Sequence, residues 1–362
     1  MRSSRPTLRS LAAEAGVSAM AFSLALRNSP EIAPRTRARL RRLAAIRGYR
    51  PDPTIAKLMH HLRVGASARL QANICGLKQA FAWPSTLDFD NREHNALERR
   101  AKALGFAFDT IEIGPETKGP LLQRVLLSRG VEGVVMMSMA GQRDLGGLLD
   151  WGKFSVVSVT ASVTAPSFHS VMPNHFDNML HVCRELTGRG FRRIGLAISK
   201  DWDERVRHRW TGGIAWQNEF GRTNPIPVFL GESLGPAVAD SGFSAWLRRH
   251  SPDALVLHAI DQELLANALR AIPARRRPKV VTLNWPHKFA DAGIDQRAEE
   301  IGSVAINLLS GMILQGEKGI PARANITMVE GNWIPGGLGS SQSGTILRGK
   351  RILPMHPASV SS

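Results

Sequence analysis

The first apolar pattern in the chain predicts a short helix that begins near Thr7. Four apolar side chains occupy one helical face at i, i+3, i+4 and i+7, namely Leu8, Leu11, Ala12 and Ala15. Gly16 gives the backbone freedom of a sharp turn, and Ser18 is a suitable N-cap for a second helix. That helix buries one face, formed by Phe22, Ala25 and Leu26. Two short helices joined by a glycine-containing turn are typical of a helix-turn-helix motif.

A third helix and a linker follow this pair. Residues 31–50 place Leu40, Leu43 and Ala44 at helical spacing. Pro51 and Pro53 then exclude a helix across the next few residues. Residues 54–62 are a short amphipathic stretch, and residues 63–70 are a linker rich in small side chains.

From about residue 72, short apolar runs alternate with amphipathic segments. The predicted strands are Ile74–Leu77, Phe106–Ile113, Val131–Ser138, Phe154–Thr160, Arg193–Ile198, Pro227–Leu230, Ala254–His258 and Lys279–Asn284. The predicted helices are His94–Leu104, Leu121–Ser128, Phe176–Thr187, Asp203–Phe220, Ala237–His250, Gln262–Ala271 and Asp295–Leu314. Such repeats imply parallel sheets with helices on both faces, and their number favours two lobes. The fold class is therefore an all-α three-helix head followed by an α/β body of two Rossmann-like lobes.

Charge is concentrated at the N-terminus. The 362 residues carry a formal net charge of +17. Residues 1–70 contain 14 Lys and Arg against three acidic residues, whereas the other 292 residues contain 33 basic and 27 acidic residues. A basic segment that contains a helix-turn-helix motif predicts binding to double-stranded DNA, because phosphates dominate the affinity of such proteins.

Several functional classes have no support in the sequence. Cys75 and Cys183 are far apart in apolar contexts, which indicates reduced, buried thiols and no disulfide framework. The N-terminus has no apolar core of a signal peptide, and no run of about 18 apolar residues predicts a membrane span. His60 and His61 are adjacent and do not face one metal ion. No catalytic motif is present, so we expect no enzyme, no cofactor, no metal and no membrane contact, and a cytoplasmic protein associated with the nucleoid.

The head resembles the N-terminal helix-turn-helix of the lactose-repressor (LacI) family of bacterial transcription regulators. The matching positions are Thr7, Leu8, Ala12, Ala15, Gly16, Val17, Ser18, Ser23, Ala25, Leu26 and Asn28. The sequence departs from the family pattern at Ser10, usually Asp, and at Ala21, usually Thr. The resemblance implies that the second helix enters the major groove. The residues expected to contact DNA are Thr7, Ser18, Ala19, Met20, Ser23, Leu24, Arg27, Asn28, Tyr49 and Leu58.

Leu58 enters this set because residues 54–62 lie where the family has its hinge helix. In the family, that helix forms on operator binding and wedges a leucine into the minor groove. The usual Ala-Arg before the leucine is Ile55-Ala56 in this chain, and Lys57 or Arg63 are the candidates to replace the missing arginine.

The body resembles the effector domain of the same family, which has the periplasmic-binding-protein type I fold. The expected domains are residues 1–50 for the helix-turn-helix, 51–70 for hinge helix and linker, 71–338 for the two-lobed effector-binding and dimerisation domain, and 339–362 for a disordered tail. The stretch RVRHRWTGG resembles the family's Arg-x-x-Gly element, with Arg209 as its arginine. The family's late strand ends in an acidic pair, which is Asn284-Trp285 in this chain.

A ligand between two such lobes is expected at the carboxyl ends of the strands. The candidate ligand-binding residues are Phe81, Trp83, Ser138, Asn174, Arg209, Asn284, Trp285 and Gln296. A guanidinium such as that of Arg209 suits paired oxygens, although it could instead pair with Glu204. A tryptophan in the cleft could stack on a sugar ring, although Trp202, Trp210 and Trp216 could equally be ordinary core residues.

The sequence therefore favours a transcription regulator, in the first instance a repressor, that binds a pseudo-palindromic operator as a homodimer. A small ligand, with a carbohydrate favoured, would control it from between the lobes. Two alternatives from other classes are a solute-binding receptor and a sugar-processing enzyme, each using the two-lobed body. An alternative within the same class is control by a purine-like corepressor.

Overall fold

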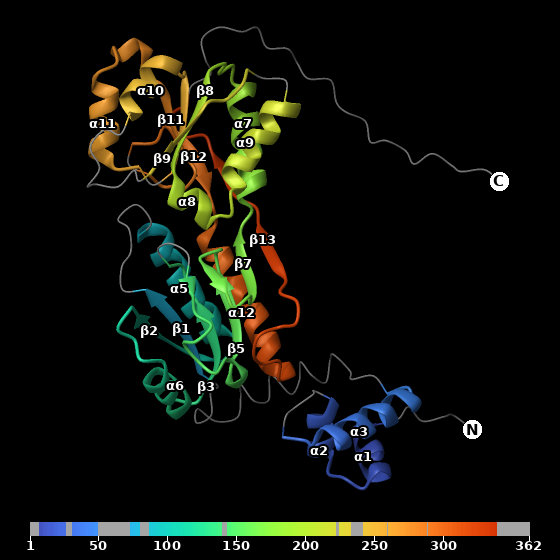
Figure 1. Ribbon diagram of the computed structural model, residues 1–362. Helices are drawn as coiled ribbons and strands as arrows, with labels where there is room; N and C mark the ends of the chain where they lie inside the picture. The colour runs from blue at the N-terminus through green and yellow to red at the C-terminus, as the bar shows by residue number, and fades with distance from the viewer. Residues whose placement is uncertain are drawn as a thin grey trace, which may run out of the picture.

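The computed structural model describes residues 7–26, 31–49, 73–79, 87–139, 143–221, 224–232, 242–258, 260–287 and 289–338. These form a helical head and a two-lobed body (Figure 1). The expected hinge helix and linker at 51–70 and the expected tail at 339–362 lie outside the described residues.

The head consists of three helices, α1 (Leu8–Ala15), α2 (Ala19–Leu26) and α3 (Pro34–Ile46). The apolar stripes predicted for the three helices pack together in one core. The buried residues of this core, each at most 4% exposed, are Leu11, Ala12, Phe22, Ala25, Leu40 and Ala44. The third helix predicted within residues 31–50 is confirmed, and it begins at Pro34, since proline suits the first helical position.

Lobe 1 is built on a six-stranded parallel sheet in the order β13-β7-β5-β3-β1-β2. Its strands are β1 (Asn73–Gln79), β2 (Ala107–Ile113), β3 (Val131–Met136), β5 (Ser155–Val159), β7 (His169–Pro173) and β13 (Ile326–Val329). Helices α5 (Leu87–Ala103) and α12 (Ala298–Gln315) cover one face, and α6 (Gly119–Ser128) packs on the other. A two-stranded sheet of β4 (Arg143–Asp144) and β6 (Val163–Ala165) lies beside it.

Lobe 2 has a second six-stranded sheet in the order β14-β12-β11-β10-β8-β9. Five strands are parallel, namely β8 (Ile194–Ser199), β9 (Val228–Gly231), β10 (Ala254–Leu257), β11 (Lys279–Thr282) and β12 (Ala292–Asp295). The sixth, β14 (Asn332–Ile334), is antiparallel to β12. One face packs on α7 (His175–Gly188), α8 (Lys200–Arg205) and α9 (Arg209–Phe220), the other on α10 (Phe243–His250) and α11 (Gln262–Arg270).

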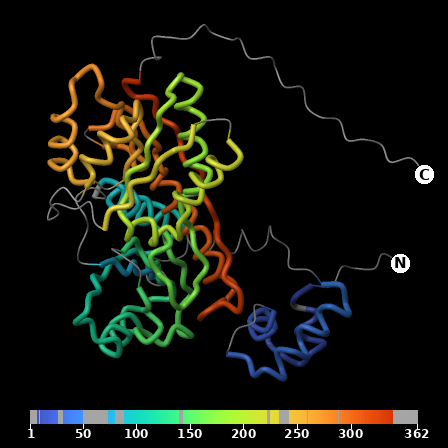
Figure 2. The backbone as a smooth tube through the Cα atoms, turned by 45° about the horizontal axis from the view of Figure 1, so that its top comes forward, coloured from blue at the N-terminus to red at the C-terminus, as the bar shows by residue number. Residues whose placement is uncertain are grey.

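The chain passes between the lobes three times, after β7, after β12 and after β13. Helix α12 and strand β13 therefore follow lobe 2 in sequence but belong to lobe 1, and in both views the orange-red segment lies beside the green strands (Figures 1 and 2). The backbone amide of Asn174, directly after β7, donates to the carbonyl of Val329, the last residue of β13, at 2.8 Å. The first and third passages thus lie side by side.

Several predicted helices have the wrong limits. Helix α5 begins at Leu87 and not at His94, and α10 begins at Phe243 and not at Ala237. The helix predicted over Asp203–Phe220 is interrupted, because Arg207 and His208 have φ of +56° and +55° and cannot continue a right-handed helix. The helix predicted over Asp295–Leu314 begins only at Ala298, since Asp295 ends β12 and Arg297 has φ of +58°. The short strands β4, β6, β7, β12, β13 and β14 were not predicted, because two to five residues carry too little periodicity.

Candidate nucleic-acid interface and interlobe site

Side chains at the helix ends fix the geometry of the head. The hydroxyl of Thr7 accepts from the Ser10 amide at 3.1 Å, and the hydroxyl of Ser10 accepts from the Thr7 amide at 3.0 Å. This is a capping box, so the departure from Asp at position 10 leaves the helix end satisfied. Gly16 has φ of +68°, and the Ser18 hydroxyl accepts from the Ala21 amide at 3.1 Å. The turn and the N-cap predicted from the sequence are therefore confirmed.

The outward face of α2 is the candidate base-reading surface. Met20 is 68% exposed and Ser18 is exposed, whereas Ala19, Ser23 and Leu24 are half-buried. Ala19 also packs partly against the head core, as does Tyr49 beyond α3. Three further residues expected to contact DNA, Arg27, Asn28 and Leu58, lie outside the described residues.

Two arginines of the third helical segment have structural partners. Arg47 forms an ion pair with Glu14 of α1, with Nη2 and Oε1 separated by 2.5 Å. Arg39 donates to the carbonyl of Ala15 at 3.2 Å and so satisfies the carboxyl end of α1. Arg35 and Arg42 are exposed on α3, where they can face phosphates.

A small, partly open cavity of about 40 Å³ lies between the lobes. It is lined at the carboxyl ends of strands from both sheets, with Ser138 after β3 and Thr160 after β5 in lobe 1, and His258 after β10 in lobe 2. This is the position that parallel α/β sheets favour for a ligand. The volume holds a few water molecules at most, and a sugar ring therefore requires displacement of a lining side chain or separation of the lobes.

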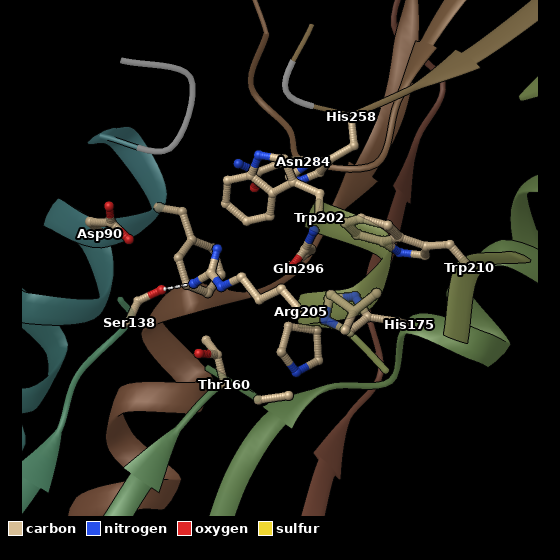
Figure 3. Close-up of a pocket in the computed structure, with 14 residues that line it drawn as sticks. Asp90, Ser138, Thr160, His175, Trp202, Arg205, Trp210, His258, Asn284 and Gln296 are labelled. Carbon is tan, nitrogen blue, oxygen red and sulfur yellow. Dashed lines mark hydrogen bonds between the residues drawn. The ribbon is translucent and has the colours of Figure 1, made fainter. Parts of the chain in front are cut away.

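The interlobe arginine, Arg205 of α8, fills much of this space (Figure 3). Its Nη2 donates to the Ser138 hydroxyl of lobe 1 at 2.5 Å, and its guanidinium carbon lies 4.3 Å from the ring centre of Trp202. Arg205 is 7% exposed. Burial lowers its pKa to about 10, against the attraction of Asp90 and Glu93. The side chain thus remains a buried cation at neutral pH.

Glu93 is a fully buried acid on lobe 1 that attracts this cation. It is fully buried on α5, and among the described residues neither carboxyl oxygen has a hydrogen bond of normal geometry. Burial, followed by the neighbouring Asp90, raises the pKa of Glu93 to about 8, although the Ser138 backbone and Arg205 act in the opposite direction. Glu93 is therefore mainly protonated at neutral pH.

An aromatic wall forms the lobe 2 side of the cavity. The ring of His258 lies 4.7 Å from that of Trp202 and 4.5 Å from that of Trp210, and His175 meets Trp210 edge-on at 5.0 Å. Burial lowers the pKa of His175 to about 3 and also lowers that of His258. Both rings are neutral, and neither Nδ1 has a hydrogen-bond partner within the described part of the chain. The wall thus combines apolar faces with unsatisfied polar atoms.

Thr160 is held in an unusual backbone conformation at the cavity. Its φ is +66°, which a β-branched residue adopts only when the surroundings require it. Its amide donates to the carbonyl of Val171 at 2.9 Å, so the neighbouring strand fixes this geometry.

A second arginine links the lobes near the second passage of the chain. Arg92 of α5 donates through Nη2 to the Asp295 carboxylate at 3.0 and 3.1 Å, and through Nη1 to the carbonyl of Trp285 at 3.4 Å. It also pairs with Glu299 at the start of α12, at 2.7 Å. The hydrogen bond that Arg92 donates to Glu299 raises the pKa of Arg92, which stays charged.

The structure brings some of the predicted ligand-binding residues together. Ser138, Asn284 and Gln296 line the cavity. Asn174 instead caps α7, where its side chain accepts from the Asp177 amide. Trp285 lies half-buried and outside the lining set, while Phe81 and Trp83 lie outside the described residues.

The predicted arginine, Arg209, lies four residues after Arg205, which occupies the cavity, and the break between α8 and α9 separates the two. Arg209 begins α9 and donates to the carbonyl of Val206 at 3.1 Å, and it is not a lining residue. Sequence reasoning missed the lining side chains Asp90, His175, Trp202, Arg205, Trp210 and His258 as a set. The available signal for Arg205 was the stretch RVRHR, which begins with Arg205 and ends with Arg209. The sequence does not show which of these arginines is buried.

Other features bear on the functional class. No group of three or more metal-ligating side chains occurs among the described residues. Within the same residues, no helix is both long enough and apolar enough to cross a bilayer. Cys75 and Cys183 are buried free thiols as predicted, and burial raises the pKa of each to about 12.

No protein-family profile and no curated protein matches the sequence. Solved structures do match. The Lac repressor dimer bound to operator and the anti-inducer ONPF has a TM-score of 0.51 and 16% identity, covering 91% of this chain and 98% of that chain. The transcriptional regulator CelR–cellobiose complex has 0.52 and 18%, with 91% and 98% covered. The Cra transcriptional dual regulator from Pseudomonas putida, in complex with fructose 1-phosphate, has 0.53 and 19%, with 72% and 97% covered.

These likenesses span the helical head as well as both lobes, because two of the three matches cover nine-tenths of the chain. The head and the two-lobed body together therefore have the fold of the lactose-repressor (LacI) regulators.

Proposed function

We propose that the chain is a sequence-specific DNA-binding regulator of transcription, acting as a repressor under control of a small ligand. One combination carries this proposal: a capped helix-turn-helix with an exposed α2 face is joined to two lobes with a cavity between them, which aromatic and polar side chains line. The structural neighbour that is a dimer bound to operator supports the same assignment. The protein would act in the cytoplasm, at the nucleoid.

On DNA, α2 would lie in the major groove, and a homodimer would place two such helices on a pseudo-palindromic operator. Met20 and Leu24 can contact thymine methyl groups but cannot donate hydrogen bonds to bases. Ser23 and Arg27 would contact phosphates or a base edge. Discrimination would then depend on apolar contacts and on bending of the duplex at Leu58.

The ligand would bind between the lobes at the cavity lined by Ser138, Asn284 and Gln296. A carbohydrate is favoured because the wall of Trp202 and Trp210 can stack on a ring, and because two neighbours carry cellobiose and fructose 1-phosphate. The ligand regulates only if it binds the open and closed arrangements with different affinity.

The test is selection of a binding site from random DNA, followed by gel-shift titration of the full chain at several salt concentrations. We expect a palindromic site and an affinity that falls steeply with salt, because many phosphates are neutralised. Arg27→Ala and Leu58→Ala should weaken binding, whereas Arg248→Ala, an exposed arginine on α10, serves as a matched control. A flat salt dependence, or unchanged affinity in both variants, would contradict the proposed docking.

The rival functions predict different results. A solute-binding receptor binds a ligand but retains no DNA, and a sugar-processing enzyme turns the ligand over. A purine-like corepressor strengthens operator binding when a nucleobase is added. A thermal-shift screen with sugars and nucleobases, repeated in the gel shift, separates these outcomes.

A further inference from the structure

The guanidinium of Arg205 sits where a ligand between the lobes would sit. It reaches from α8 of lobe 2 into the cavity and ends at the Ser138 hydroxyl of lobe 1 (Figure 3). It contacts the Trp202 ring and that hydroxyl, and the carboxyl group of Asp90 lines the same cavity and attracts it. An aromatic face beside carboxyl groups is the arrangement by which proteins bind organic cations.

This cation cluster, defined as Asp90, Ser138 and Trp202, is not saturated by Arg205. A guanidinium has five N–H donors, yet within the described residues its hydrogen bond goes to Ser138 alone. Both carboxyl oxygens of Glu93 and the Nδ1 atoms of His175 and His258 are buried without a hydrogen bond. Buried polar atoms without partners are uncommon in folded proteins. An untethered molecule could satisfy more of them than a side chain fixed to α8.

Arg205 also has an alternative partner outside the cavity, the carboxylate of Asp201. Asp201 lies four residues earlier, is exposed, and already attracts the Arg205 guanidinium. Residues spaced by four face the same side of a helix, so an ion pair with Asp201 at the surface is sterically reasonable. Departure of Arg205 would enlarge the present cavity of about 40 Å³ and would break the interlobe hydrogen bond to Ser138.

We propose that the effector is an organic cation, a protonated amine or guanidinium on a small hydroxylated skeleton, which displaces Arg205 from the cation cluster. The inference rests on the proposed ligand-controlled function and specifies the charge of the ligand. Arg205 would then compete with the ligand for the cation cluster and so lower the apparent affinity of the ligand. Ligand binding would also break the hydrogen bond between Arg205 and Ser138 that joins the two lobes.

The test is isothermal titration calorimetry of the full chain at slightly acidic pH with four probes. Glucosamine, glucose and glucuronate share one ring and differ in charge, and agmatine carries a guanidinium without a ring. We expect at least one cation to bind tenfold or more tightly than glucose, with glucuronate the weakest. The tighter of the two cations identifies an amino sugar or a guanidino compound as the source. Equal or tighter binding of glucose or glucuronate, or no binding of either cation, overturns the proposal.

Variants of Arg205 provide a second, independent test. Arg205→Met removes the charge and keeps an apolar side chain beside Trp202, and Arg205→Ala repeats the test if that variant is poorly folded. Either should bind the preferred cation, and free methylguanidinium, at least tenfold more tightly than the unmodified chain. Asp90→Asn should weaken the cation tenfold and leave glucose unchanged. Arg248→Met, an exposed arginine in lobe 2, is the matched control. Weaker cation binding after removal of Arg205 overturns displacement.

A gel shift separates this inference from the function on which it rests. A cation that binds in calorimetry and leaves operator affinity unchanged supports the cation site and contradicts ligand control. Operator binding that responds only to neutral or anionic probes supports the proposed function and overturns the cation assignment.

Discussion

Arg92 and Asp295 are 203 positions apart and belong to different lobes, yet Arg92 Nη2 donates to both carboxyl oxygens of Asp295, at 3.0 and 3.1 Å. The pair lies where the chain passes from β12 to α12, and Glu299 joins it from the helix. Together with the Arg205–Ser138 hydrogen bond, it gives each lobe one arginine that reaches into the other.

Replacing Arg92 should loosen the contact between the lobes. Arg92→Met removes the paired hydrogen bonds to Asp295 and leaves its carboxylate less satisfied, so we expect a loss of about 1–3 kcal/mol in the free energy of unfolding. Arg99→Met, an exposed arginine on the same helix, should change it by less than about 0.5 kcal/mol. Urea denaturation of both variants measures the difference, and equal losses would show that the pair contributes nothing specific.

The pH dependence of stability should report Glu93. Its folded pKa of about 8 lies above the ordinary value of 4.5, so the folded state keeps a proton that the unfolded state has lost. The stabilisation is present below pH 4.5 and disappears as the pH rises through about 8. Arg205, which attracts Glu93 across the cavity, keeps its charge in this window.

Glu93→Gln should remove that dependence. The free energy of unfolding of the unmodified chain, minus that of Glu93→Gln, should fall by a few kcal/mol, on the order of the pKa shift, between pH 4.5 and 8. His175, with its pKa of about 3, destabilises the fold as the pH falls below 6.5 in both proteins and cancels in the subtraction. A difference that stays constant with pH would show that Glu93 is ionised in the folded protein.

Two glycines of α12 should respond in opposite ways to the same substitution. A Cβ on Gly302 would lie 2.9 Å from the carbonyl oxygen of Glu93 and 3.0 Å from Ala96 Cβ, so Gly302→Ala must push α5 away. We expect a cost of about 1–3 kcal/mol. Gly311→Ala meets nothing within 4 Å and should stabilise the helix by up to about 1 kcal/mol. Thermal unfolding of the two variants checks the sign.

In the head, Gly16 is required for its backbone angle and not for space. A Cβ at Gly16 would meet no atom within 4 Å, but φ is +68°. Gly16→Ala should therefore destabilise the head by about 1 kcal/mol, and Gly16→Asn by less, since asparagine tolerates this region better. Hydrogen exchange of the head amides in the full chain measures both. Identical protection in all three proteins would disprove strain at the turn.

The exposed apolar surface of α2 should matter only on DNA. Met20→Ala should weaken binding to the selected operator about three- to tenfold, because contacts with thymine methyl groups are lost. Ile46→Ala, which removes a similarly exposed apolar side chain from α3, should have a smaller effect. Gel-shift titrations compare the two, and an equal or larger effect of Ile46→Ala would argue against α2 as the reading helix.

Much of the fold follows from local patterns, and much of the site does not. The stripe of Leu8, Leu11 and Ala12 predicts the buried face of α1, and the turn at Gly16 predicts its end. Pairs of strand and helix predict the two lobes. The break between α8 and α9 was missed because it depends on Asp203, whose buried carboxylate accepts from the Thr211 amide and hydroxyl at 3.3 and 2.7 Å.

That break decides which arginine enters the cavity. A continuous helix would place Arg205 and Arg209 on one face, a turn apart, and sequence similarity selected Arg209. The two αL residues redirect the chain between them, so that Arg205 points across the cavity while Arg209 contacts Val206. Strand β13 was equally invisible, since half-exposed Ile326 and Met328 become a strand only beside β7.

The passage of the chain through lobe 2 and back has a consequence for the order in which the protein can be made. Lobe 1 needs α12 against its sheet and β13 at its edge, and both are encoded after the whole of the lobe 2 parallel sheet. A nascent chain that has reached Asp295 still exposes the apolar face of β3, β5 and β7 that α12 later covers. The first lobe to be synthesised thus cannot be completed until the parallel sheet of the second has been made, and every premature termination before residue 329 leaves it unfinished.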